Sequence, residues 1–223
     1  GMAFAAWSLA GAYRIKGNLA EAIAEFKKAK KMFEALKDKS GLGYCFTGLG
    51  GASRVAERYS DSLKYYTQAN KAFMTLKDRF GIAYSYCGIA NAMRMKEDFK
   101  GALKFFKKAK DNYKKIGDRV SYAYTLWGEG SALQVLGKDA LALRDFNEAE
   151  RLFRITKDRR GIVYCMISKG QLAFKKDAEK GKGILQDALL RAKALGIKVE
   201  AGYARKVLLA MKSALEKLPL NLA

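Results

Sequence analysis

The chain has 223 residues, enough for one large domain or two small ones with a sizeable hydrophobic core. Half of the residues are hydrophobic and 29% are charged, as in globular proteins, and a net charge of +21 favours an acidic partner over a neutral one. Histidine is absent, which excludes Ser-His and Cys-His nucleophiles and the zinc sites that need imidazole.

A step of 40 residues recurs along the whole chain. Three kinds of residue recur every 40 positions, and we call each set of equivalent residues a column. One column consists of aspartates in the turns, one of aromatic residues and one of alanines. These columns are Asp38, Asp78, Asp118 and Asp158; Phe26, Tyr66, Phe106 and Phe146; and Ala29, Ala69, Ala109 and Ala149. A period of this length indicates stacked supersecondary units, because one unit alone cannot bury its apolar face.

Two helices are predicted in every unit, since apolar residues recur at steps of three and four. In chain order the predicted pairs are 3–16/19–37, 40–56/59–77, 80–96/99–117, 120–136/139–156 and 160–176/179–195, with a capping helix at about 198–217. The corresponding repeats are 3–42, 43–82, 83–122, 123–162 and 163–197. Glycines such as Gly17 and Gly137 suit the helix ends, and the recurrent aspartates suit the N-caps of the first helices. We therefore predict an all-α solenoid that forms a single domain over 1–223.

The first unit carries a family resemblance. It reads Leu9-Ala10-x-Ala12-Tyr13-x3-Gly17-x-Leu19-x2-Ala22-x3-Phe26-x2-Ala29. This pattern resembles the tetratricopeptide repeat, although the usual unit has 34 residues and ends in proline. The longer, proline-free unit is similar to the variety found in cell-polarity adaptors and Rap-type regulators. The resemblance implies a right-handed superhelix of five helix pairs, whose first helices line a concave groove for a peptide or protein.

The same resemblance implies which residues face the groove. Families of this kind turn one stripe of each first helix inward, and here the stripe forms a tyrosine row, an arginine row and a set of polar side chains. The predicted groove residues are Arg14, Tyr44, Arg54, Tyr84, Asn91, Arg94, Tyr124, Trp127, Ser131, Gln134, Tyr164 and Gln171, with Trp7 and Ile167 on the same stripe. Guanidinium groups bind carboxylates bidentately, and aromatic rings supply rigid anchoring area.

Each row also has a structural interpretation. Tyrosines at helical spacing can pack between neighbouring units, and the arginines can bond neighbouring carboxylates or the last carbonyls of helices. Trp127 can serve as packing or as a ligand anchor. The sequence leaves these alternatives open.

The second helix of the third unit is strongly basic. Its outward face carries Lys100, Lys104, Lys107, Lys108, Lys114 and Lys115, with only Asp111 of opposite sign. Such a face can simply be solvated, or it can attract phosphate groups in a sequence-blind manner. Aromatic residues interleaved with the lysines, as expected of a single-strand binder, are not evident in this helix face.

Motifs of catalysis are missing. The sequence has no P-loop and no EF-hand, and the glycine pairs such as Gly48 and Gly50 fall inside a predicted helix. Cys45, Cys87 and Cys165 are far apart, so they are expected to be buried thiols of a reducing, cytoplasmic compartment and not a disulfide framework or a metal pair. We predict no catalytic residue, no metal site, no cofactor and no membrane span.

These observations favour a non-catalytic scaffold whose groove binds an acidic or amphipathic segment of a partner protein. Two alternatives stay open: binding of nucleic acid or another anionic surface through the basic convex face, and self-association by stacking of solenoid ends. The oligomeric state, and occupation of the groove by the chain's own residues 218–223, are left undecided.

Overall fold

The computed structural model describes residues 1–212, and this part of the chain consists of eleven α-helices without a strand. The helices are α1 (Met2–Lys16), α2 (Leu19–Ala35), α3 (Lys39–Val55), α4 (Tyr59–Leu76), α5 (Arg79–Met95), α6 (Phe99–Ile116), α7 (Arg119–Val135), α8 (Asp139–Ile155), α9 (Arg159–Phe174), α10 (Ala178–Ala194) and α11 (Lys198–Lys212). The predicted all-α architecture is confirmed, and the predicted helix limits agree to within two residues through α10. The predicted end of the last helix at 217, and the tail 218–223, lie outside the described residues.

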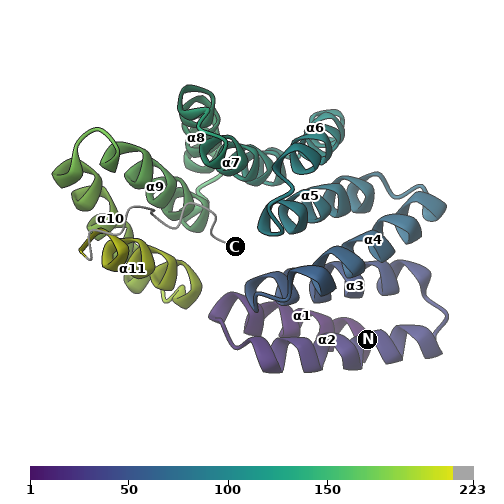
Figure 1. The fold of residues 1–223 in the computed structure, drawn as a ribbon. Helices are drawn as coiled ribbons and strands as arrows, with labels where there is room; N and C mark the ends of the chain where they lie inside the picture. The colour runs from purple at the N-terminus through teal and green to yellow at the C-terminus, as the bar shows by residue number, and fades with distance from the viewer. Residues whose placement is uncertain (213–223) are drawn as a thin grey trace. The chain divides into compact units, whose positions relative to one another are not determined.

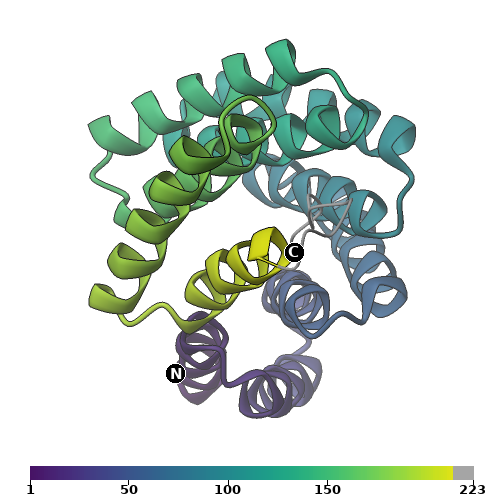
Figure 2. The ribbon, with the colours of Figure 1, turned by 60° about the vertical axis from the view of Figure 1, so that its left-hand side comes forward.

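The helices form two compact units. The first, Gly1–Asp118, contains the pairs α1/α2, α3/α4 and α5/α6, and α2 also packs against α3 and α4 against α5 (Figure 1). The second begins at Arg119 and contains the pairs α7/α8 and α9/α10, with α11 packed against α10 and α9 (Figure 2). A single domain over 1–223 and a right-handed superhelix stay predictions.

Small and aromatic columns build the core of the first four pairs. The alanine column and the aromatic column predicted from the 40-residue step are both buried. Their members are Ala29, Ala69, Ala109 and Ala149, all at 0% exposure, and Phe26, Tyr66, Phe106 and Phe146, none above 5%. The alanines let two helices approach closely, and the rings fill the space that the alanines leave.

A glycine in the first turn of the first helix packs against a phenylalanine ring of the preceding repeat. The pairs are Gly41 with Phe33, Gly81 with Phe73, and Gly161 with Phe153, where a Cβ would lie 2.2, 2.3 and 2.4 Å from the ring. No side chain fits at such a distance. The glycines therefore fix how closely one repeat approaches the next.

The turns before these helices are held by the predicted aspartate caps. A carboxylate oxygen accepts the backbone N–H of the residue three positions on, at 2.9 Å in each case. The pairs are Asp38 with Gly41, Asp78 with Gly81, and Asp158 with Gly161. The same glycine thus donates its N–H to the capping aspartate and packs against the phenylalanine ring, so each cap aspartate is followed three residues later by a glycine.

The turns also use residues that sequence rules do not favour. Gly17, Gly117 and Gly137 take the left-handed backbone conformation, as glycine does readily. Five other residues adopt it at φ between 54° and 66°: Lys37, Glu57, Lys77, Glu97 and Lys157. Each of these positions costs roughly 1 kcal/mol relative to glycine. The cost is offset by packing on both sides of the turn.

A buried ion pair fastens α11 to α9. Nε of Arg160 donates to Oε1 of Glu200 at 2.7 Å, and the Glu200 side chain is fully buried. The guanidinium also lies 5.4 Å from the centroid of the Tyr164 ring. Burial opposes the charge of Arg160, but Tyr164 and Glu200 overcome that effect and raise its pKa above the ordinary value. Arg160 therefore stays a cation beside the Glu200 side chain.

Replacing Gly81 by alanine tests the close contact between repeats. We expect Gly81→Ala to lower the free energy of unfolding by about 2–3 kcal/mol, because the new methyl group must displace the Phe73 ring. Gly11→Ala is the matched control, since a Cβ there meets nothing within 4 Å and helix propensity alone should add about 0.5–1 kcal/mol. Urea unfolding followed by circular dichroism at 222 nm measures both. Equal effects of the two changes would contradict the packing argument.

Replacing Glu200 by glutamine tests the buried pair. Glu200→Gln leaves the half-buried Arg160 guanidinium without a counter-charge, so the free energy of unfolding should fall by about 3 kcal/mol, the lower end of the range for buried pairs. Asp187→Asn breaks an exposed pair with Arg191 and should cost about 0.5 kcal/mol or less. The same urea titration applies. A loss for Glu200→Gln no larger than for the control would show that the pair contributes little to holding α11.

Candidate functional site

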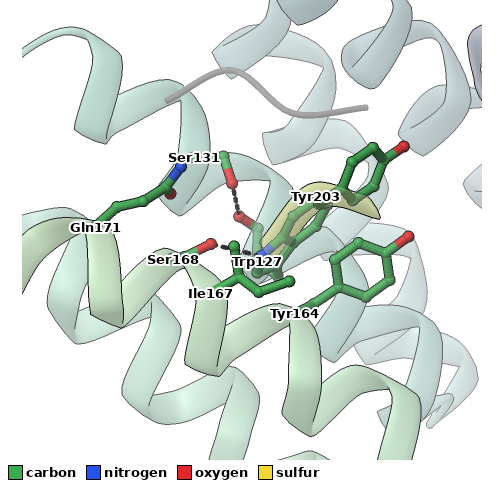
Figure 3. A pocket seen from close by; sticks show the side chains of 7 residues that line it. All are labelled: Trp127, Ser131, Tyr164, Ile167, Ser168, Gln171 and Tyr203. Atoms are coloured by element: carbon green, nitrogen blue, oxygen red, sulfur yellow. Dashed lines mark hydrogen bonds between the residues drawn. The ribbon is translucent and has the colours of Figure 1, made fainter. Parts of the chain in front are cut away.

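A small pocket lies among the first helices of the second unit. Residues from α7, α9 and α11 line it: Trp127, Ser131, Tyr164, Ile167, Ser168, Gln171 and Tyr203 (Figure 3). The cavity that they enclose measures about 10 Å³, which is room for a single water molecule. Trp127, Ser131, Tyr164 and Gln171 are predicted groove residues, and the structure brings all four together.

Internal contacts order the aromatic wall of this pocket. Nε1 of Trp127 donates to Oγ of Ser168 at 2.9 Å, and the hydroxyl of Ser131 donates to the carbonyl oxygen of Trp127 at 2.9 Å (Figure 3). The rings of Trp127 and Tyr164 lie 4.5 Å apart between centroids. Trp127 thus both packs within the unit and lines the pocket.

Helical spacing in the sequence did not identify two of the lining residues, Ser168 and Tyr203. Ser168 lies beside the predicted stripe, and Tyr203 comes from α11, which was assigned only a capping role. Tyr203 lies 39 residues after Tyr164, so extending the repeat register into α11 would have placed an aromatic residue near the groove. The rings of Tyr164 and Tyr203 lie 6.4 Å apart between centroids.

The rest of the tyrosine row makes contacts between helices. The hydroxyl of Tyr44 donates to Oδ2 of Asp78 at 2.9 Å, and its ring lies 4.9 Å from that of Phe73. Burial, with Asp78 adding to it, raises the pKa of Tyr44 to about 12. Tyr124 contacts Phe153 in the same way, with ring centroids 4.6 Å apart. These contacts agree with the packing interpretation of Tyr44 and Tyr124.

Tyr84 is the remaining member of the row. It is half-buried, and its ring stacks on Phe80 at 6.1 Å between centroids. Both residues lie on α5, one helical turn apart, so this contact is within a helix and not between repeats.

The arginine row occupies α1, α3 and α5 of the first unit. Burial raises the pKa of Tyr66, and the positive charges of Arg54 and Arg14 oppose that rise. Burial and Glu57 likewise raise the pKa of Tyr59, and Arg54 and Arg94 oppose it. Each tyrosine therefore lies near two successive guanidinium groups, which places the three arginines along one side of the unit.

Gly51 lies in the middle of this row and is buried. A Cβ on Gly51 would lie 3.2 Å from the hydroxyl of Tyr66 and 3.6 Å from Cδ of Arg14, so a side chain here would be crowded. Arg14 and Arg54 are half-buried, and Arg14 makes no ion pair within residues 1–212.

Arg94 differs from its two counterparts because its side chain is fully buried. Its Nη2 donates to Oδ1 of Asn91 at 3.3 Å, and Nδ2 of Asn91 donates to the carbonyl oxygen of Cys87 at 3.0 Å. Asn91 therefore acts within α5. Gln134 follows the arginines in the repeat register, is 1% exposed, and forms no hydrogen bond through its amide to the described part of the chain.

The basic face of α6 is a separate feature. The six predicted lysines, Lys100, Lys104, Lys107, Lys108, Lys114 and Lys115, are all exposed on the side away from the buried residues of α6. Among residues 1–212 no group of three or more cysteine, aspartate or glutamate side chains is arranged to hold a metal ion. Nor does any helix in that range have the length and apolar character needed to cross a membrane.

Comparison with known proteins finds similarity in structure only. Neither a protein-family model nor a curated protein matches the sequence. A Rap protein crystallised with the competence and sporulation factor superposes with a TM-score of 0.73 and 13% identity over 95% of this chain and 64% of the Rap protein. RapI in its apo form superposes with a TM-score of 0.66 and 14% identity over 95% of this chain and 83% of RapI.

Two further structures extend the comparison. Aspartyl phosphate phosphatase F from Bacillus subtilis gives a TM-score of 0.67 and 12% identity over 96% of this chain and 60% of the phosphatase. BtubC from P. vanneervenii gives a TM-score of 0.58 and 13% identity over 92% of this chain and 93% of BtubC. The chain thus spans less than two thirds of the first Rap protein and of the phosphatase. Its fold is the tetratricopeptide-like stack of helix pairs found in Rap proteins.

Proposed function

We propose that the chain is a non-catalytic protein-interaction scaffold whose first helices bind an acidic or amphipathic segment of a partner protein, in the cytoplasm. The observation that carries the proposal is the arginine row of the first unit, where Arg14 and Arg54 are half-buried and Arg14 makes no ion pair within residues 1–212. The arginine row of the first unit supplies the preference for acidic residues.

The pocket in the second unit has no room for a side chain. Its cavity of about 10 Å³ is far below the roughly 300–1,000 Å³ typical of ligand sites, and Trp127, Ser131, Tyr164 and Gln171 are all buried. These residues pack the core of the second unit, and the charged residues of the first unit are the ones that would meet a ligand.

The arginine row suits carboxylates. Planar guanidinium groups bind them through two parallel hydrogen bonds, and a half-buried cation gains from a counter-charge more than an exposed one does. Arg14 and Arg54 are both half-buried. An acidic segment would therefore be held by charge in the first unit.

The structural neighbours add support of a general kind. A Rap protein of this fold has been crystallised with the competence and sporulation factor, and we extend ligand binding of that kind to this chain as part of the proposal. Another neighbour bears the name of an aspartyl phosphate phosphatase. A scaffold without catalysis should release no phosphate from acetyl phosphate.

Synthetic peptides test the proposal. The probes are fluorescein-labelled 12-residue peptides that alternate leucine with glutamate, and a second series with lysine in place of glutamate. We expect saturable anisotropy changes at micromolar concentration for the acidic series alone.

A charge-reversal pair identifies the residues. Arg14→Glu with Arg54→Glu should weaken the acidic peptides at least tenfold, since two charge-assisted contacts are lost. Lys27→Glu with Lys64→Glu makes the same change in net charge at exposed positions of α2 and α4 and should leave binding intact. Circular dichroism at 222 nm must match wild type in both. Equal weakening by the two pairs would mean that net charge, and not the arginine row, governs binding.

A further inference from the structure

The outward face of α6 presents cations that have no counter-ion. Lys100, Lys104, Lys107, Lys108 and Lys115 are exposed, and within residues 1–212 none of them forms an ion pair. Asp111 is the one acidic residue of the helix. From Lys100 to Lys115 the row extends about 22 Å along the helix axis.

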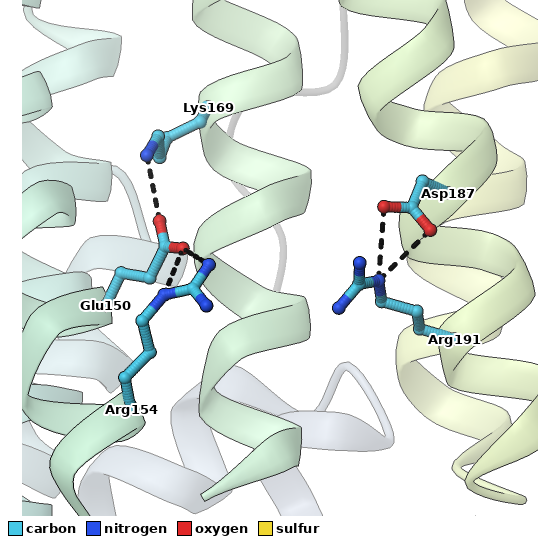
Figure 4. A network of polar contacts seen from close by, with 5 residues as sticks. All are labelled: Glu150, Arg154, Lys169, Asp187 and Arg191. Atoms are coloured by element: carbon cyan, nitrogen blue, oxygen red, sulfur yellow. Dashed lines mark hydrogen bonds and ion pairs between the residues drawn. The ribbon is translucent and has the colours of Figure 1, made fainter. Parts of the chain in front are cut away.

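The corresponding helix of the next repeat, α8, is arranged differently. Its arginines are paired with acidic residues of the same helix: Arg144 with Asp145, Arg151 with Glu148, and Arg154 with Glu150. Glu150 also accepts a hydrogen bond from Nζ of Lys169 on α9 at 2.8 Å (Figure 4). Burial opposes its ionisation, yet Lys169 and Arg154 hold the pKa of Glu150 below its ordinary value. Unpaired cations are therefore not a general property of second helices in this protein.

Aromatic rings border the lysine row. Tyr86 of α5 and Phe105 of α6 are half-buried, with ring centroids 5.9 Å apart, and Nζ of Lys108 lies 5.4 and 5.0 Å from these centroids. The sequence of α6 alone did not reveal this cluster, because one of its rings comes from the other helix of the pair.

The arrangement recurs one repeat earlier. Phe46 of α3 stacks on Tyr65 of α4 at 6.4 Å between centroids, and Nζ of Lys30 lies 6.0 Å from the Phe46 ring. A half-buried aromatic pair is thus present in two consecutive repeats, but the lysine over the earlier pair comes from α2 of the preceding helix pair.

We propose that this basic-aromatic face, formed by Lys100, Lys104, Lys107, Lys108, Lys115, Tyr86 and Phe105, binds single-stranded nucleic acid without sequence preference. The lysines supply point charges for successive phosphates, and the rings at the edge of the row supply surfaces on which bases stack. The proposal is independent of the groove, which the first helices line.

Other anionic partners fit this face less well. Within α6 the large apolar residue exposed to solvent is Ile116, at the end of the helix, so the lysine row has no side chain to insert into a lipid layer. Carboxylates of an acidic protein are recognised best by arginine, and α6 contains none. A nucleic acid strand accounts for both features, because its phosphates would meet the lysines and its bases would stack on the rings.

Fluorescence anisotropy with labelled dT20 and rU20 tests the proposal. We expect micromolar affinity at 50 mM salt and a loss of about 100-fold at 200 mM, since five phosphate contacts on a single strand give a slope near −3.5. Lys100→Glu with Lys104→Glu and Lys107→Glu should abolish saturable binding. Lys176→Glu with Lys180→Glu and Lys193→Glu is the matched control, because it reverses three exposed lysines of the second unit and should retain most of the affinity.

A second variant separates stacking from charge. Tyr86→Leu with Phe105→Leu keeps apolar volume and net charge, and should weaken dT20 at least fivefold while leaving inorganic polyphosphate binding unchanged. Circular dichroism verifies folding of every variant. The proposal is overturned if the leucine variant binds dT20 as tightly as wild type does. It is also overturned if polyphosphate or polyglutamate displaces labelled dT20 as well as unlabelled dT20 does, or if phosphatidylserine vesicles bind more tightly than dT20.

Discussion

The architecture depends on a glycine that approaches the aromatic ring of the preceding repeat more closely than any side chain would allow. Gly81 against Phe73 is representative, and the same contact is made by Gly41 and Gly161. Because the contact is short and rigid, it fixes the step between consecutive helix pairs. A fixed step places equivalent residues of the first helices on one line, so rows such as the arginine row exist only because this contact repeats.

Much of the fold follows from local signals. The 40-residue period, the glycines and the cap aspartates define where helices begin and end, and these features act within a few residues of each boundary. The buried alanine column follows as directly, because Ala69 and its equivalents occupy the same place on a helix face. The left-handed turns at Glu57 and Glu97 were not predictable in the same way, since tertiary packing overrides the preference for glycine there.

The candidate sites show where local reasoning ends. Helical spacing placed Trp127 and Gln171 on one face, and they do meet in a pocket. Spacing could not tell that Arg94 is wholly covered while Arg14 is half open, because burial depends on neighbouring helices. For the same reason the ion pair of Arg160 with Glu200, which are 40 residues apart, could not be predicted from the sequence pattern.

The three thiols of the chain differ in ways that matter for chemical labelling. Cys45 and Cys165 are fully covered, and burial raises the pKa of Cys45 to about 12 and raises that of Cys165 as well. The thiolate is the reactive form of cysteine, so neither of these residues is available to alkylating reagents in the folded protein. Cys87 is half-buried on α5, beside Asn91. A maleimide probe would therefore attach at Cys87 first and report on the helix that carries the deepest of the three guanidinium groups.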